Sequence, residues 1–309
     1  MKFSTHSAIF RWKPAAWLRV SGEDAASFLQ GQFTNELRGL GSGQAVYGLW
    51  LNLKGKVVAD SFVVAAVSGG EAAGAGGWRE FWVGSYFSPA AVIRERLESH
   101  IIADDVTIED CTAGWEGVSV FGETGITARF ASEVRAGVVF TGRRGEQENA
   151  EWVFPTLPSE NAGPGWTQCR GMRELDAMET ERRRIVAGIP AVPADVGPGD
   201  LPNEGGLDVG AVSYTKGCYL GQEVMARLKS MGQVRRRLLR VAVEASEVPP
   251  LPAQLFTGER KIGELRSAVP DGAGGFVGLA MLSLLHLPLD GGLALAPGGT
   301  AVVQLRDRP

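Results

Sequence analysis

The sequence changes character at about residue 233, and this change constrains the fold more than any other feature. From there to the C-terminus, short strand-like runs alternate with glycines and prolines. Such a pattern is typical of a small antiparallel barrel or sandwich. The strands expected in this part of the chain are residues 238–243, 261–269, 275–281 and 301–305.

The preceding part of the chain mixes helices and strands. Ser21, followed by Glu23 and Asp24, predicts a short helix over residues 22–30, because Ser favours the N-cap and acids favour the first turn. Ser88 and Pro89 predict the start of another helix, which runs to about residue 99. Further helices are expected at 172–186 and 222–229, and strands or extended chain at 46–53, 56–67, 80–87, 106–120 and 137–155.

Three segments read as irregular. Residues 68–77 resemble a flexible hairpin loop, and residues 157–165 a turn-rich break. Residues 189–206 hold four prolines among several glycines, and a long irregular segment inside a compact domain is often functional. The whole chain is therefore expected to be α+β, followed by an all-β module.

The composition restricts the class of protein. The chain has 309 residues, enough for two or three domains. Its net charge of -4 argues against a general nucleic-acid coat, so direct nucleic-acid binding is not expected. No secretory signal and no apolar run of about 18 residues is found, which predicts a cytoplasmic protein that does not enter the membrane.

The cysteines and histidines give no metal-binding pattern. The three cysteines, Cys111, Cys169 and Cys218, are too far apart in the sequence for a disulfide framework and indicate a reducing compartment. Neither a CxxC pair nor an HxxxH pair occurs, so no preformed metal site is expected.

The segment 216–223, Lys-Gly-Cys-Tyr-Leu-Gly-Gln-Glu, is a dense cluster of functional residue types. Lys216 and the start of the helix expected near Gly221 both favour a thiolate at Cys218. An alternative is that Cys218 is a small buried apolar residue and Lys216 a solvated charge. A strip of basic residues follows the cluster. It could bind carboxylates or an RNA backbone, or it could be a solvated strand face. Its members are Arg227, Lys229, Arg235, Arg236, Arg237 and Arg240.

The cluster resembles the signature of the YgfZ-type folate-binding family, whose members are similar to the glycine-cleavage aminomethyltransferase. The resemblance continues on both sides of the signature and covers nearly the whole chain in order. The matching blocks are residues 20–25, 28–32, 34–35, 54–60, 187–190, 202–204, 207–208, 226–227 and 232–236. One departure is Val186, which stands where the family usually has the Glu expected to bind the pterin.

The resemblance implies a three-domain aminomethyltransferase-like folate-binding fold around a central hole. The parts expected are residues 1–110, residues 111–232 with the signature, and a C-terminal β-barrel at 233–309. It further implies tetrahydrofolate or a derivative as ligand and a role in iron–sulfur cluster assembly or repair. The partners would be iron–sulfur proteins such as tRNA-modifying radical enzymes.

The resemblance also assigns candidate site residues. Cys218 is the expected functional thiol, with Lys216 beside it. Folate would be bound by Asp60, Glu204, Tyr219, Gln222, Glu223 and Arg227. We expect a cleft lined by Asp60, Lys216 and Arg227. Two alternatives remain, an authentic tetrahydrofolate-dependent aminomethyltransferase and an RNA-binding module, and whether the protein turns over a substrate by itself is left open.

Overall fold

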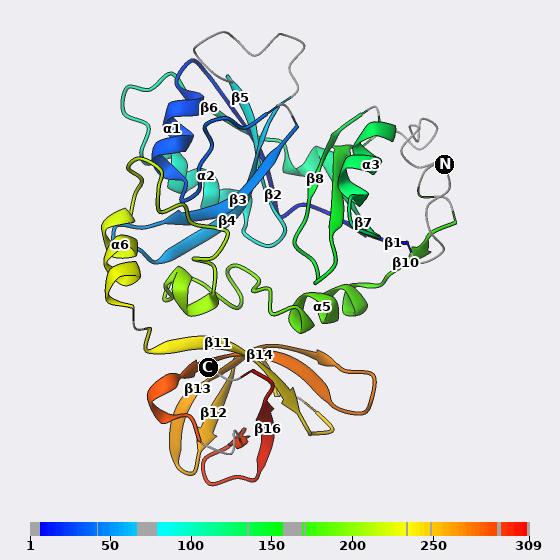
Figure 1. Ribbon diagram of the computed structural model, residues 1–309, viewed down its shortest axis with the longest axis vertical. Helices are drawn as coiled ribbons and strands as arrows, with labels where there is room; N and C mark the ends of the chain where they lie inside the picture. Colours follow the sequence, from blue (N-terminus) through cyan, green and yellow to red (C-terminus); the bar gives the residue numbers. More distant parts are fainter. Residues whose placement is uncertain are drawn as a thin grey trace.

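The structure, a computed structural model, describes residues 7–41, 43–66, 79–134, 136–156, 169, 171–232, 234–247, 249–288 and 292–307. It consists of two five-stranded sheets, an irregular segment with two helices, and a C-terminal barrel (Figure 1). The loops expected at 68–77 and 157–165 lie outside the described residues. No helix in the described part is long and apolar enough to span a membrane.

The first sheet is antiparallel and has the strand order β3-β4-β5-β2-β6. Helices α1 and α2 pack on one face through a large apolar cluster. The helix expected at residue 22 begins later, at Ala25, because Ser21 still belongs to a strand and Gly22 has φ +137°. The elements are β2 (Ala16–Ser21), α1 (Ala25–Gln32), β3 (Ala45–Leu51), β4 (Val57–Ala65), β5 (Glu80–Ser85), α2 (Ala90–Glu98) and β6 (Thr107–Asp110).

The second sheet has the order β10-β1-β7-β9-β8, so the N-terminal strand pairs with strands that follow the whole first sheet. The two sheets meet through aromatic side chains, among them Trp17, Phe62 and Phe140. Helix α3, which the sequence did not predict, packs on β8 and β9. The elements are β1 (Ala8–Trp12), β7 (Trp115–Phe121), α3 (Ile126–Glu133), β8 (Val138–Thr141), β9 (Asn149–Pro155) and β10 (Arg173–Glu174).

An irregular segment with helices leads to the barrel. Helix α5 (Ala177–Val186) starts later than expected, because residues 173–174 form β10 and Asp176 caps the helix by accepting a hydrogen bond from Glu179 N at 2.7 Å. The predicted irregular stretch at 189–206 contains only the short 3-10 helix η3 (Pro202–Gly205). The helix expected at 222 is α6 (Gln222–Met231).

The C-terminal strands form a closed six-stranded barrel, which confirms the predicted antiparallel barrel. The four expected strands are present, and two more, β12 and β15, complete the ring. The strands are β11 (Arg236–Val243), β12 (Ala253–Thr257), β13 (Arg260–Pro270), β14 (Phe276–Ser283), β15 (Gly292–Ala294) and β16 (Ala301–Leu305).

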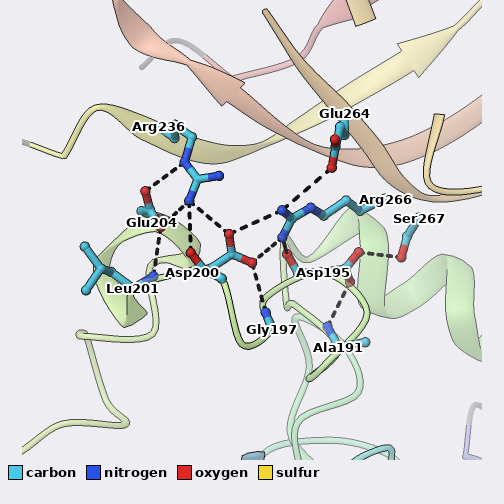
Figure 2. Close-up of polar contacts among 11 residues, drawn as sticks. Ala191, Asp195, Gly197, Asp200, Leu201, Glu204, Arg236, Glu264, Arg266 and Ser267 are labelled. Atoms are coloured by element: carbon cyan, nitrogen blue, oxygen red, sulfur yellow. Dashed lines mark hydrogen bonds and ion pairs between the residues drawn. The ribbon is translucent and has the colours of Figure 1, made fainter. Parts of the chain in front are cut away.

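Buried carboxylates join the irregular segment to the barrel, as Figure 2 shows. Asp200 accepts hydrogen bonds from two barrel arginines, Arg236 at 3.0 Å and Arg266. Asp195 accepts from Ser267 Oγ of β13 at 2.5 Å and from Arg184 Nη1 of α5 at 2.7 Å. Each carboxylate is almost fully buried, and buried charges are tolerated when they are paired and hydrogen-bonded in this way.

We predict that Asp200→Asn lowers the free energy of unfolding by about 2–4 kcal/mol, because it removes the buried carboxylate that pairs with the mostly buried Arg266 and with the partly exposed Arg236. Chemical denaturation measures the change. Glu264→Gln is the matched control: Glu264 contacts the same Arg266 from the partly exposed side, at 3.9 Å, and its loss should cost less than about 1 kcal/mol. Equal stabilities of the two variants would contradict the role given to Asp200.

Candidate functional site

The signature lies in the loop that leads into α6. Cys218 is exposed, whereas the next residue, Tyr219, is buried against residues of β3, β4 and α6. The helix start predicted at Gly221 is confirmed: Gly221 is the N-cap, with φ +85°. A Cβ at this position would lie 3.0 Å from the carbonyl oxygen of Asn52, so the loop passes very close to the β3–β4 turn. The exposed thiol therefore sits between residues that are fixed in the fold.

Lys216 fixes the loop from the other side. Its side chain is 4% exposed, and its ammonium donates to the carbonyl oxygens of Gln30 at 2.7 Å, Phe33 at 2.6 Å and Asn35 at 2.9 Å. These carbonyls lie at the end of α1 and just after it, where helix carbonyls lack intrahelical partners. Burial lowers the pKa of Lys216 to about 8. The charge expected beside the thiol is thus directed at backbone oxygens of another segment.

The other two cysteines have different surroundings. Cys111 is half-buried, and burial, with the charge of Glu109 next in importance, raises the pKa of its thiol. Cys169 is buried, which raises its pKa to about 11. Cys218 is therefore the cysteine that is most exposed to a reaction partner.

Asp60 forms a polar centre on β4, at the face that the first sheet turns toward the second. It is 4% exposed. One carboxylate oxygen accepts hydrogen bonds from Ser85 at 2.7 Å and Ser88 at 2.6 Å, and the other accepts from Tyr47 at 3.0 Å. Burial raises the pKa of Asp60, against the opposing effect of these hydrogen bonds and of the Arg143 charge.

Ser88 illustrates a difference from the sequence prediction. It was expected to cap α2, but the N-cap is Pro89, and no side-chain cap bond is present there. The Ser88 hydroxyl instead donates to Asp60 and lies 3.0 Å from the carbonyl oxygen of Val192, in the irregular segment. The buried carboxylate is the stronger acceptor, so tertiary contact overrides the local capping pattern.

A second buried carboxylate lies close by and was not predicted. Glu151 of β9 is fully buried and accepts hydrogen bonds from Tyr86 at 2.7 Å, Ser119 at 2.7 Å and Arg144 at 3.2 Å. The neighbouring Arg143 places its guanidinium 3.8 Å from the centre of the Tyr47 ring, and so joins this centre to that of Asp60. A glutamate followed by an apolar run in β9 and the neighbouring pair Arg143-Arg144 were the available sequence signals.

The remaining predicted site residues are dispersed. Glu204 is buried, and its carboxylate is occupied by Arg236 at 2.9 and 3.0 Å and by Leu201 N at 2.8 Å. Gln222 begins α6, with Glu223 exposed in its first turn and Arg227 exposed one turn later. Asp60, Lys216 and Arg227 therefore have separate surroundings in the described structure, and Asp60 and Lys216 share no hydrogen-bond partner there.

Val186, the departure from the family pattern, lies at the end of α5. It is 42% exposed and lines a pocket of about 360 Å³ together with residues of β11 and β14. Its carbonyl oxygen accepts a hydrogen bond from Arg240 at 2.6 Å. Two members of the basic strip are likewise structural: Arg240 pairs with Asp307, and Arg236 pairs with Asp200 and Glu204. No group of three potential metal ligands occurs among the described residues.

The chain is similar to known proteins over most of its length. A family model described as the GCVT N-terminal domain matches residues 2–125, and one described as the CAF17 C-terminal beta-barrel domain matches residues 235–306. The "Iron-sulfur cluster assembly factor IBA57, mitochondrial" of Mus musculus is 31% identical over 256 residues, which are 79% of this chain and 67% of that protein. The chain belongs to the IBA57 family of iron–sulfur cluster assembly factors.

Other relatives agree with this assignment. The IBA57 protein of Homo sapiens is 29% identical over 291 residues, covering 89% of this chain and 77% of that protein. Among solved structures, the glycine cleavage system aminomethyltransferase T from Bartonella henselae superposes with a TM-score of 0.76 at 15% identity, over 98% of this chain and 86% of that one. The predicted aminomethyltransferase-like α+β fold is confirmed.

The predicted cytoplasmic location is wrong. The IBA57 relatives are named as mitochondrial proteins, which contradicts it. The expectation rested on the lack of a secretory signal and of a long apolar run, together with free thiols, and these features do not distinguish one reducing compartment from another.

We predict that Lys216→Met lowers the free energy of unfolding by about 2–4 kcal/mol, because three carbonyl oxygens lose a charged donor while the packing of the side-chain stem is kept. Lys229→Met is the matched control. The Lys229 ammonium lies 4.1 Å from the centre of the Tyr214 ring, at an exposed position of α6, and its loss should cost about 1 kcal/mol or less. A Lys216→Met protein as stable as the wild type would show that the three hydrogen bonds contribute nothing.

Proposed function

We propose that this protein is a folate-binding iron–sulfur cluster assembly factor in which Cys218 is the functional thiol. The observation that carries the proposal is the presentation of Cys218: it is exposed, while Lys216 and Tyr219 on either side are buried. A thiolate is a soft nucleophile and metal ligand. Because the chain belongs to the IBA57 family, we propose an iron–sulfur cluster, or the protein that carries it, as the substrate of this thiol.

A single thiol is too few ligands for a cluster, so a partner must supply the others. An iron–sulfur protein that docks over the loop before α6 would meet Cys218 directly, because this residue is exposed. The sequence signature supports a finer proposal, a YgfZ-type factor whose clients include tRNA-modifying radical enzymes. We propose these clients as one class of partner.

The folate site that we propose is centred on Asp60. Its residues fit a pterin: three hydroxyl groups engage the carboxylate, and among the described residues the oxygen facing Tyr47 accepts a hydrogen bond from Tyr47 alone. This oxygen therefore retains capacity for a further N–H donor. The ring centre of Phe62 lies 5.1 Å from that of Tyr47 and 5.2 Å from that of Tyr86, and these rings supply apolar surface beside it. Bound tetrahydrofolate would supply one-carbon or redox chemistry at this centre.

The other predicted binding residues contribute less to this proposal. Glu204 is engaged by Arg236, and Gln222, Glu223 and Arg227 belong to α6, beside the thiol. We therefore propose that the α6 residues and Tyr219 act with Cys218 in partner recognition. The boundaries at residues 110 and 232 remain our proposal for the three domains.

We predict that Asp60→Asn abolishes tetrahydrofolate binding in a calorimetric titration and leaves the melting temperature at pH 7 unchanged or higher. The amide oxygen still accepts from both serines, and the amide nitrogen donates to Tyr47. Because burial raises the folded-state pKa of Asp60 above 3.8, the stability associated with its protonated form is lost as pH rises through that pKa. The stability of Asp60→Asn relative to wild type should therefore increase with pH over this window, and unaltered folate affinity would refute the site.

We predict that Cys218→Ser leaves the melting temperature and the folate affinity nearly unchanged, with less than about 1.5 kcal/mol lost, because the exposed thiol makes little packing contribution. The same variant should fail to restore iron–sulfur enzyme activity in cells that lack the protein.

Cys111→Ser is the matched control and should restore this activity. Full restoration by Cys218→Ser would contradict the role of the thiol, and turnover of aminomethylated lipoyl carrier protein would support the aminomethyltransferase alternative.

A further inference from the structure

A pocket of about 380 Å³ lies beside the signature loop, away from the Asp60 centre. It is lined by Asn52, Leu53, Lys54, Arg96, His100 and Leu220. These residues come from the β3–β4 turn, from α2 and the second residue after its end, and from the second position before α6. Figure 1 shows α6 next to the β3–β4 hairpin, and the close approach of Gly221 to Asn52 fixes this arrangement. Leu220 is two residues from the exposed thiol of Cys218.

Arg96 has an unusual environment in this pocket. It is 8% exposed, and its guanidinium donates to Leu51 O at 3.0 Å and to Gln32 Oε1 at 3.0 Å, and contacts His100 Nδ1 at 2.9 Å. The remaining nitrogen, Nη2, is buried and has no hydrogen-bond partner. No carboxylate in the described part of the chain forms a salt bridge with Arg96, although every other arginine of similar burial has one.

The absence of a counter-ion is costly. A buried charge normally acquires a hydrogen-bonded partner of opposite sign, because desolvation is otherwise uncompensated. Burial alone lowers the pKa of Arg96 to about 10, which leaves the guanidinium positively charged at neutral pH. Lys54 adds an exposed ammonium at the rim, and no acidic side chain lines the pocket. The charge of the pocket is therefore positive and unneutralised from within the described chain.

We propose that this pocket binds an oxyanion, a carboxylate or a phosphate group, with Arg96 Nη2 as the buried donor and Lys54 at the rim. One free guanidinium nitrogen offers two diverging N–H groups, so it donates one hydrogen bond to a given anionic oxygen and does not form the bidentate fork that both terminal nitrogens would form. His100 contacts Arg96 through Nδ1, so in the tautomer in which Nδ1 accepts this bond, Nε2 carries a proton and is a further donor. An anion held here lies next to the loop that carries Cys218.

The proposal is independent of the iron–sulfur and folate functions, because it rests on Arg96 and its surroundings alone. Two sources supply the ligand chemistry. One is a free phosphate or the phosphate group of a small molecule, and the other is the carboxylate of a small acid or an acidic side chain. Inorganic phosphate and glutarate represent the two sources as probes.

The test is calorimetric titration of the full-length protein with each probe, at an ionic strength held constant with chloride. We expect at least one probe to bind, and Lys54→Gln to weaken its binding about fivefold or more, since a nearby charge contributes on the order of 1 kcal/mol. Lys54→Gln changes an exposed side chain, so the melting temperature without ligand should stay unchanged. Lys13→Gln, at an exposed lysine between β1 and β2, is the matched control and should bind as the wild type does.

Arg96→Lys tests the buried donor itself. It keeps the charge but lacks the Nη2 group, and we expect it to lose probe binding while circular dichroism shows a folded protein. If Arg96→Lys does not fold, Lys54→Gln decides the question. The proposal is overturned if neither probe binds the wild type, or if the probe that binds has the same affinity for Lys54→Gln as for Lys13→Gln.

Discussion

The structure depends on the pairing of buried carboxylates in residues 189–206 with arginines from other elements. Asp195 and Asp200 lie in an irregular segment that gives each of them one backbone donor, Ala191 N and Gly197 N, and the charged donors come from α5 and from the barrel. The same segment supplies the Val192 carbonyl oxygen that contacts Ser88, one of the donors to Asp60. The barrel, the linking segment and the first sheet are thus held by one connected set of polar contacts. Such a network has a specific geometry when every buried charge in it is paired. The loss of any one contact then leaves a buried group without a partner.

Two buried cations follow a different rule. Lys216 and Arg96 both lie near the end of α1, and their hydrogen-bond partners are backbone carbonyls and neutral side chains rather than carboxylates. Lys216 is fully engaged by three oxygens, whereas one nitrogen of Arg96 is left without a partner. The two residues therefore differ in what they offer. Lys216 fixes the position of the signature loop, and Arg96 has one guanidinium nitrogen that can still donate a hydrogen bond to a ligand.

The candidate chemistry is divided between two places. Asp60 lies in the interior, where the two sheets and the linking segment meet, and its raised pKa marks a carboxylate whose charge is not favoured by burial. Cys218 lies at the surface, on the loop before α6. This separation supports two distinct roles, small-molecule binding at the interior carboxylate and partner contact at the exposed thiol. The exposed thiol is the group that a protein partner can reach, which is why it carries the proposed function.

The sequence by itself determined the features that depend on local spacing. The barrel strands, the start of α6 at Gly221 and the irregular stretch at 189–206 follow from the positions of glycines, prolines and alternating apolar residues. The signature likewise identified Cys218, because neighbouring residues define it. Tertiary structure alone decided what the charged residues do. The Lys216 acceptors are more than 180 positions away in the sequence, and Asp60 receives donors from two other strands and a loop. A buried charge needs a hydrogen-bond partner that is close in space. Which residue lies close in space depends on the tertiary fold, and the local sequence pattern does not give it.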